Sequence, residues 1–235
     1  MKLPQIKHPT FSITLPSTKK EVRYRPFLVK EEKILLFAQQ SNESKDIIHA
    51  IKQIVSNCII TEGVDVEQFT TYDIEYFFIQ LRAKSVNDEV KLNYIDNEDK
   101  KQYSFDVNLN DVKVIYPDGH DPHIVITETT SITLKEPVFS VLEAMKATTE
   151  SELAYEAVAK CIQKIEAEGQ VYDLADFSEE EVMDFVQSLD VITFQKIQQF
   201  FDTMPRLEYV IKYKNSLDND RQIVLNSLND FFTLG

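Results

Sequence analysis

Glycine, cysteine and basic residues are scarce in this sequence. Its 235 residues include only four glycines and two cysteines, and 39 acidic residues outnumber 25 basic ones. A glycine-rich phosphate loop is absent, as are the motifs Gly-x-Ser-x-Gly, His-Glu-x-x-His and Cys-x-x-Cys. No residues can therefore be assigned an enzymatic role, and we expect a protein that is not an enzyme and binds no cofactor.

The excess of acidic residues argues against polyanionic partners. A formal net charge of -14 would repel nucleic-acid phosphates and anionic membranes. No apolar run approaches the length needed to cross a bilayer, and the first 25 residues lack the apolar core of a secretion signal. We therefore expect a soluble protein that contacts neither nucleic acid nor membrane, and a basic protein is the more plausible partner.

Metal binding has few candidate ligands. Cys58 and Cys161 fall on the apolar faces of expected helices, which is typical of reduced thiols in a core. Two histidines and two aspartates lie close together in the sequence, but two prolines and a glycine around them favour a tight turn between strands. We expect that turn and no metal at Asp118, His120, Asp121 and His123.

One helix-start pattern occurs twice. Thr70 is followed three residues later by Asp73, and Ser178 is followed at the same spacing by Glu181. A hydroxyl residue and an acid at this spacing form a capping box, in which each side chain binds the amide of the other residue. Apolar residues at helical spacing follow in both copies. Two of them are expected to be equivalent and buried, Phe77 and Phe185.

A second amphipathic helix precedes each capped helix. One is expected to start at Ser44 and to end before Gly63, and the other to start at Ser151 and to end at Gly169. The sequence thus predicts a duplicated helical hairpin. Coincidence is the alternative, because capped amphipathic helices are common.

Alternating apolar and polar residues predict strands in two further regions, 87–136 and 207–225. The expected fold class is α+β and mainly helical, with the duplicated helical hairpin, a central antiparallel β segment and a C-terminal β-hairpin. The chain is expected to divide into an extended N-terminal arm (1–23), a first helical part (24–86), the antiparallel β segment (87–136), a second helical part (137–204), and the C-terminal β-hairpin with an apolar tail (205–235).

Five stretches of the sequence are familiar: YRPFLVKEEKILL at 24–36, DIEY at 73–76, LRAKSV at 81–86, FFDTMPRL at 200–207 and LNDFF at 228–232. Together they resemble the baseplate hub subunits and hub assembly proteins of T-even-type contractile-tailed bacteriophages. The resemblance implies a non-enzymatic component of the baseplate hub that binds neighbouring hub or tape-measure proteins during tail assembly. The alternative that it leaves open is a transient hub assembly chaperone, absent from the mature particle.

The same resemblance implies a location in the tail baseplate of the virion and, during assembly, in the host cytoplasm. It leaves open an oligomer within the baseplate. Partner contacts are expected from the proline-rich N-terminal arm and the apolar C-terminus, which lack obvious partners in the chain. The expected partner-binding residues are Phe11, Ile13, Leu15, Phe231 and Phe232.

Overall fold

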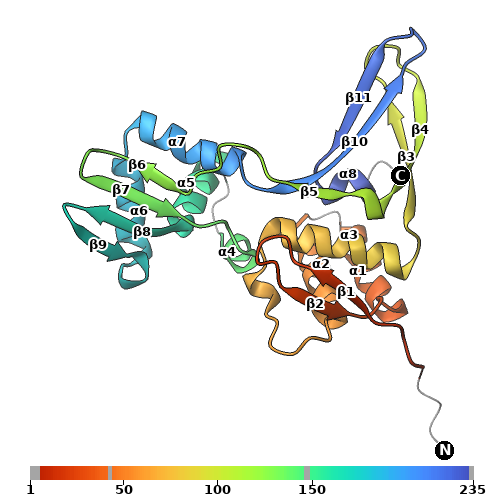
Figure 1. The fold of residues 1–235 in the computed structure, drawn as a ribbon, viewed down its shortest axis with the longest axis horizontal. Helices are drawn as coiled ribbons and strands as arrows, with labels where there is room; N and C mark the ends of the chain where they lie inside the picture. Colours follow the sequence, from red (N-terminus) through yellow and green to blue (C-terminus); the bar gives the residue numbers. More distant parts are fainter. Residues whose placement is uncertain (1–5, 42–43, 146–148, 233–235) are drawn as a thin grey trace, which may run out of the picture. The chain divides into compact units, whose positions relative to one another are not determined.

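The computed structural model describes residues 6–41, 44–145 and 149–232, which form two compact units (Figure 1). The first unit combines the chain up to Ile115 with the chain from Arg206 onward, and the second comprises Tyr116–Pro205. The model is 41% helix and 29% strand, in several small antiparallel sheets. The expectation of a mainly helical fold is therefore wrong, and the protein is mixed α+β.

Unit 1 surrounds one long helix with hairpins. Helix α3 (Thr71–Ser85) follows α1 (Val29–Ser41), α2 (Ser44–Cys58) and the short 3-10 helix η1 (Val66–Gln68). The remaining elements are β1 (Phe11–Thr14), β2 (Glu21–Tyr24), β3 (Glu89–Ile95), β4 (Gln102–Asn108), η2 (Leu109–Asp111), β5 (Lys113–Ile115), β10 (Arg206–Lys214), β11 (Asp220–Leu225) and α8 (Leu228–Phe232). Strands β1 and β2 pair with each other, as do β3 and β4, and the third sheet has the order β11-β10-β5.

Unit 2 packs helices against one face of a four-stranded sheet of order β6-β7-β8-β9. Alternate residues of the strands, such as Ile132 and Leu134, join Val158, Ile197 and Phe200 of the helices in the core. The elements are β6 (His123–Val125), β7 (Thr130–Leu134), α4 (Phe139–Ala144), α5 (Glu150–Cys161), β8 (Ile162–Ala167), β9 (Gln170–Asp173), η3 (Leu174–Asp176), α6 (Glu179–Ser188) and α7 (Val191–Asp202).

Both expected capping boxes are confirmed. Thr70 and Asp73 exchange side-chain and backbone hydrogen bonds at the start of α3, and Ser178 and Glu181 do so at the start of α6. These bonds satisfy amide groups that have no partner within the helix. Phe77 is fully buried as expected, whereas Phe185 is only partly covered.

The duplicated helical hairpin is wrong in its second copy. Helix α5 ends at Cys161, and residues 162–173 form the hairpin β8–β9, in which Glu168 and Gly169 both have positive φ. A glycine in this conformation ends a helix or turns a hairpin equally well, and Ile162 and Ile165 fit both periodicities. The spacing therefore did not distinguish a helix end from a hairpin.

What recurs is a longer unit that includes a hairpin. The hairpin β1–β2 precedes α1 and α2, as β6–β7 precedes α4 and α5. In both units the residue after a strand bonds to the backbone of a buried cysteine. The amide of Arg25, after β2, donates to the carbonyl oxygen of Cys58 at 2.9 Å, and the amide of Lys135, after β7, donates to the carbonyl oxygen of Cys161 at 2.7 Å. A 3-10 helix and a capped helix then follow in both units.

An ion pair with one buried member, the carboxylate of Glu31, joins the elements of the first recurrence. Arg25 Nη2 lies 2.9 Å from Glu31 Oε1, and the same guanidinium donates to the carbonyl of Asn57 at 3.0 Å. Burial alone would raise the pKa of Glu31, but the hydrogen bonds from Arg25 and from the amide of Leu28 outweigh it and hold that pKa below its usual value. The contacts of Arg25 thus connect the end of β2 with the start of α1, where Glu31 lies, and with the end of α2, where Asn57 lies.

The expected extended N-terminal arm (1–23) forms a hairpin where the structure describes it. Residues 11–14 pair with 21–24 as a hairpin, and the amide and hydroxyl of Ser17 in its turn both donate to the carboxylate of Asp73. The ring of Tyr24 lies 5.1 Å from that of Phe77, between centroids. This hairpin is therefore part of the core of unit 1. Residues 1–5 of the expected arm lie outside the described residues.

The expected β segment 87–136 is divided between the two units. Strands β3, β4 and β5 belong to unit 1, and β6 and β7 belong to unit 2. Strand β5 pairs with β10, with Ile115 opposite Arg206, so the whole of unit 2 is inserted between two neighbouring strands of unit 1. The C-terminal hairpin β10–β11 is present, and α8 follows it.

A first prediction compares Phe69 and Phe177, the equivalent residues before the two capped helices. Phe69 is 4% exposed and Phe177 is 41% exposed. Phe69→Ala should lower the free energy of unfolding by about 3 to 5 kcal/mol, because it leaves a cavity. Phe177→Ala should lower it by about 1 kcal/mol, because little buried area is lost. Urea unfolding followed by circular dichroism measures both, and equal losses would contradict the assigned burial.

A second prediction concerns Glu75 in α3. Burial raises the pKa of Glu75 to about 7, although the amide of Leu228 donates to its carboxylate and acts in the opposite direction. The unfolded chain releases this proton near pH 4.5, so stability should fall by about 3 kcal/mol as the pH rises from about 4.5 through 7.

Replacing Glu75 by glutamine should remove this loss. The stability gain of Glu75→Gln over the parent should therefore be larger at pH 8 than at pH 5, in thermal melts at both pH values. Glu89→Gln, at an exposed position of β3, is the control. Parallel pH profiles of the parent and Glu75→Gln would show that the carboxyl group is not buried in solution.

Candidate functional site

The expected partner-binding residues do not form one surface. Ile13, Leu15 and Phe231 are buried within unit 1, and the ring of Phe11 is partly covered beside Tyr24. Ile13 and Leu15 belong to the β1–β2 region, whereas Phe231 joins the cluster around Ile79 and Leu92. Their burial leaves these three residues without surface for a partner, which corrects the expectation. The side chain of Phe232 lies outside the described part of the chain.

The aspartate and histidine turn is built without a metal-ligand cluster. The ring of His120 stacks on Phe200 at 4.7 Å between centroids, and its Nδ1 lies 3.2 Å from Thr203 Oγ1. Asp121 instead accepts the amide of His123 at 2.8 Å. Among the residues that the structure describes, no three His, Cys, Asp or Glu side chains are placed to hold a metal ion. In the same residues, no helix is both long and apolar enough to span a bilayer.

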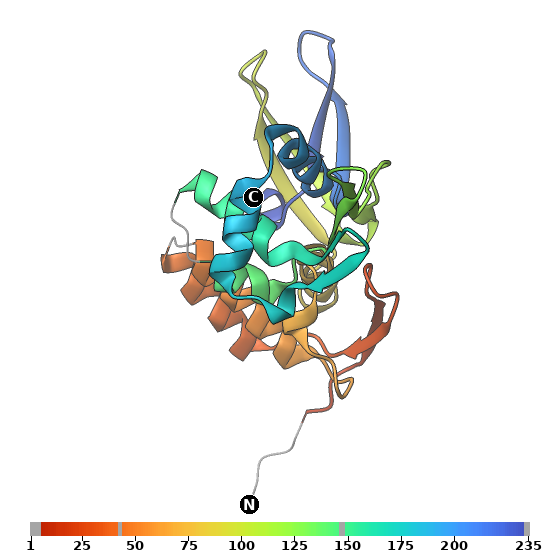
Figure 2. The same ribbon diagram turned by 90° about the vertical axis from the view of Figure 1, so that its left-hand side faces the viewer.

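The most elaborate constellation of polar side chains lies at the ends of two hairpins. We call β3–β4 and β10–β11 together the hairpin arm. Both views show the two hairpins side by side and extending away from α3 (Figures 1 and 2). Their facing sides carry aromatic rings: Tyr213 lies 5.0 Å from Tyr103 and 5.1 Å from Phe105, between centroids. The two hairpins therefore share an apolar interior below their tips.

Both tips are turns that start with a short polar side chain. The carboxylate of Asp96 accepts the amides of Glu98 and Asp99, and the side-chain oxygen of Asn215 accepts the amides of Leu217 and Asn219. Aspartate and asparagine favour such turns because their side chains replace a backbone acceptor. The tips are thus held in shape by their first residues.

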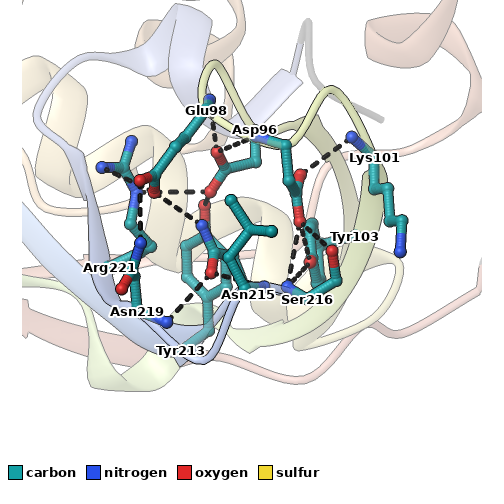
Figure 3. Close-up of polar contacts among 11 residues, drawn as sticks. Asp96, Glu98, Lys101, Tyr103, Tyr213, Asn215, Ser216, Asn219 and Arg221 are labelled. Carbon is teal, nitrogen blue, oxygen red and sulfur yellow. Dashed lines mark hydrogen bonds and ion pairs between the residues drawn. The ribbon is translucent and has the colours of Figure 1, made fainter.

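A polar network then ties one tip to the other (Figure 3). Tyr213 donates its hydroxyl to the buried Asp96 at 2.5 Å, and Arg221 Nε lies 3.3 Å from the same carboxylate. Asp99 accepts the amide of Ser216 at 2.9 Å and its hydroxyl at 2.8 Å.

Glu98 completes the connection between the tips. Its carboxylate accepts the side-chain amides of Asn215 at 2.7 Å and Asn219 at 2.8 Å. Each of these hydrogen bonds between the tips spans at least 117 residues of sequence and joins one hairpin to the other, so neither turn forms the network alone.

Two carboxylates of this network, Asp96 and Asp99, have lowered pKa values. The Tyr213 hydroxyl, followed by backbone amides and Arg221, keeps the pKa of Asp96 below its usual value. Burial would raise the pKa of Asp99, but hydrogen bonds from Tyr103, Lys101 and Ser216 outweigh it and lower that pKa strongly. Carboxylates with lowered pKa values are poor proton acceptors at neutral pH, so the arrangement suits a rigid scaffold better than acid–base chemistry.

Two apolar residues remain exposed beside this network. Ile95, at the end of β3, is 62% exposed, and Leu217, in the turn between β10 and β11, is 58% exposed. An exposed apolar side chain on a fixed turn loses little conformational entropy when a partner covers it. The tips of the hairpin arm are therefore candidate contacts with another protein.

Sequence reasoning found both hairpins but not their association. The turns DNEDKK and KNSLDND each contain an aspartate or asparagine at the first turn position, which is the local signal for their shape. No local pattern indicates that Asp96 and Tyr213 meet, since they are 117 residues apart in sequence.

The family model described as T4 bacteriophage base plate protein matches residues 8–233 of the chain. No curated protein and no solved structure gives a significant match.

A third prediction tests the network through Asp96→Asn. Because folding lowers the pKa of Asp96, its contribution to stability is present above the unfolded value of 3.8 and is lost as the pH falls through the folded value. The melting temperature of the variant should therefore lie furthest below that of the parent above about pH 5, with the gap closing toward pH 3. Asp218→Asn, where the side chain is exposed, should show no such gap. A gap that does not change with pH would mean that ionised Asp96 does not hold the tips together.

Proposed function

Because the matched region covers nearly the whole chain, this protein belongs to the T4 bacteriophage base plate protein family, and we propose that it is a non-enzymatic component of the baseplate hub. A baseplate protein resides in the tail of the virion and associates with other baseplate proteins. In this proposal the chain binds neighbouring hub or tape-measure proteins during tail assembly, which takes place in the host cytoplasm.

The hairpin arm is the observation that carries this proposal. Its tips are connected by hydrogen bonds and ion pairs between side chains of both hairpins, which fixes their shape before a partner arrives. Ile95 and Leu217 remain exposed there. A fixed polar surface with exposed apolar residues favours a binding role, because the conformational entropy of the turns is lost during folding and not when the partner binds.

The proposal includes neither catalysis nor binding of nucleic acid. In the hairpin arm the acidic side chains accept hydrogen bonds from neighbouring groups, and the pKa values of Asp96 and Asp99 are lowered. The net charge of -14 disfavours contact with phosphate backbones. The same charge favours a partner with a basic surface.

A transient assembly chaperone remains the second candidate, because the sequence resembles hub assembly proteins as well as hub subunits. The two roles differ in whether the protein stays in the finished tail. The prediction is that quantitative mass spectrometry of purified tails finds this chain at a fixed stoichiometry with other baseplate proteins. Ile95→Asn combined with Leu217→Asn should lower its incorporation at least tenfold without changing its melting temperature, because both side chains are exposed.

Val191→Asn combined with Ile192→Asn is the matched control, because these residues are 73% and 69% exposed but lie in unit 2. Absence of the chain from finished tails, with accumulation in lysates, would favour the chaperone. Normal incorporation of the Ile95 and Leu217 variant would show that the tips are not the contact.

A further inference from the structure

The two capped helices begin with the same extended motif. The sequences DVEQFT at 65–70 and DLADFS at 173–178 each run from an aspartate to the capping hydroxyl. Asp65 caps η1 and Asp173 caps η3 through the same side-chain bond to the second following amide, at 3.1 and 3.0 Å. Two local structures built in the same way can be compared for what covers each of them.

In unit 1 the hairpin β1–β2 covers the motif. The amide of Ser17 donates to Asp73 at 2.9 Å, and its hydroxyl donates to the other carboxylate oxygen. Behind these bonds Phe69 lies 6.3 Å from Phe77, between ring centroids, and both rings are buried. The turn of the hairpin therefore binds the capping acid, and Tyr24 of its second strand packs against Phe77.

In unit 2 the equivalent position is open. Phe177 is 41% exposed, and the capping acid Glu181 is exposed as well. A groove of about 370 Å³ lies between the start of α6 and the sheet. Its apolar lining includes Tyr172, Leu174, Phe177, Val182 and Phe185.

An edge strand contributes to this groove, since Tyr172 of β9 lies in its lining. Strand β9 is the edge of the sheet, all its residues are exposed, and Val171 is 65% exposed. An edge strand presents backbone donors and acceptors to which another extended chain can add. The groove and the edge together fit an extended segment better than a helix.

Charge indicates the nature of that segment. The hairpin that covers the motif in unit 1 spans 11–24 with its flank to residue 26, and its bases outnumber its acids, with Lys19, Lys20, Arg23 and Arg25 against Glu21. The start of α6 is acidic, and its first turn and approach carry Asp173, Asp176, Glu179, Glu180 and Glu181. A basic segment would neutralise these acids.

We propose that the groove at the start of α6 binds a basic β-strand segment of a neighbouring baseplate protein. In that complex an apolar side chain of the segment covers Phe177, a hydroxyl or amide group donates to Glu181, and the backbone pairs with β9. The segment would thus cover the start of α6, as β1–β2 covers the start of α3 in unit 1. This inference rests on the proposed function, since it takes the partner from the baseplate.

Photo-crosslinking tests the proposal in assembled baseplates. Phe177→p-benzoylphenylalanine places the reactive group in the groove, and Val191→p-benzoylphenylalanine is the control on an exposed position of the same unit. The expected result at position 177 is a crosslink to another baseplate protein, mapped by mass spectrometry to a segment with net positive charge and alternating apolar residues. Glu179→Lys combined with Glu180→Lys should reduce that yield at least tenfold. The variant should stay folded in a thermal melt, with only a small loss of stability, because the ion pair of Glu179 with Lys160 and the first turn of α6 are exposed.

Three results would overturn the proposal: a crosslink to a second copy of this chain, a crosslink to an acidic or helical segment, or no intermolecular crosslink in baseplates that contain the protein. Quantifying the protein in the same baseplates separates this failure from that of the proposed function. If the chain is absent from them, the hub role fails first, and the groove then has no baseplate partner.

Discussion

A single carboxylate at the start of α3 has two structural roles at once. Asp73 accepts the amide of Thr70, as a helix cap requires, and it also accepts the amide and hydroxyl of Ser17. A buried carboxylate needs several donors to offset its loss of hydration, and a helix N-terminus provides a favourable potential for it. Removing the hairpin would therefore leave a buried charge with fewer donors, which makes the first part of the chain inseparable from the core of unit 1.

The stretch at 24–36 likewise joins separate elements of unit 1. Arg25 and Glu31 form an ion pair in which the guanidinium also reaches Asn57, so it joins a strand to two helices. The backbone amide of Arg25 also donates to the carbonyl of Cys58, and in unit 2 the amide of Lys135 donates to the carbonyl of Cys161 in the same way. The two units thus share backbone contacts and helix caps, whereas the side chains that surround these features differ between the units.

The sequence predicted the features that depend on neighbouring residues. Both capping boxes, the hairpin β3–β4 and the hairpin β10–β11 follow from local spacing and turn residues. The β8–β9 hairpin was mistaken for the end of a helix because Gly169 serves either structure. The pairing of β5 with β10 and the bond between Asp96 and Tyr213 depend on chain segments far apart in sequence, which no local pattern records.

The insertion of unit 2 between β5 and β10 has a mechanical consequence. The chain leaves unit 1 after Ile115 and returns at Arg206, and these two residues are partners in an antiparallel pair. Because both chain crossings lie at the same end of this pair, unit 2 is tethered to unit 1 through β5 and β10 together. A change that breaks the pairing of Ile115 with Arg206 would therefore act on both crossings at once.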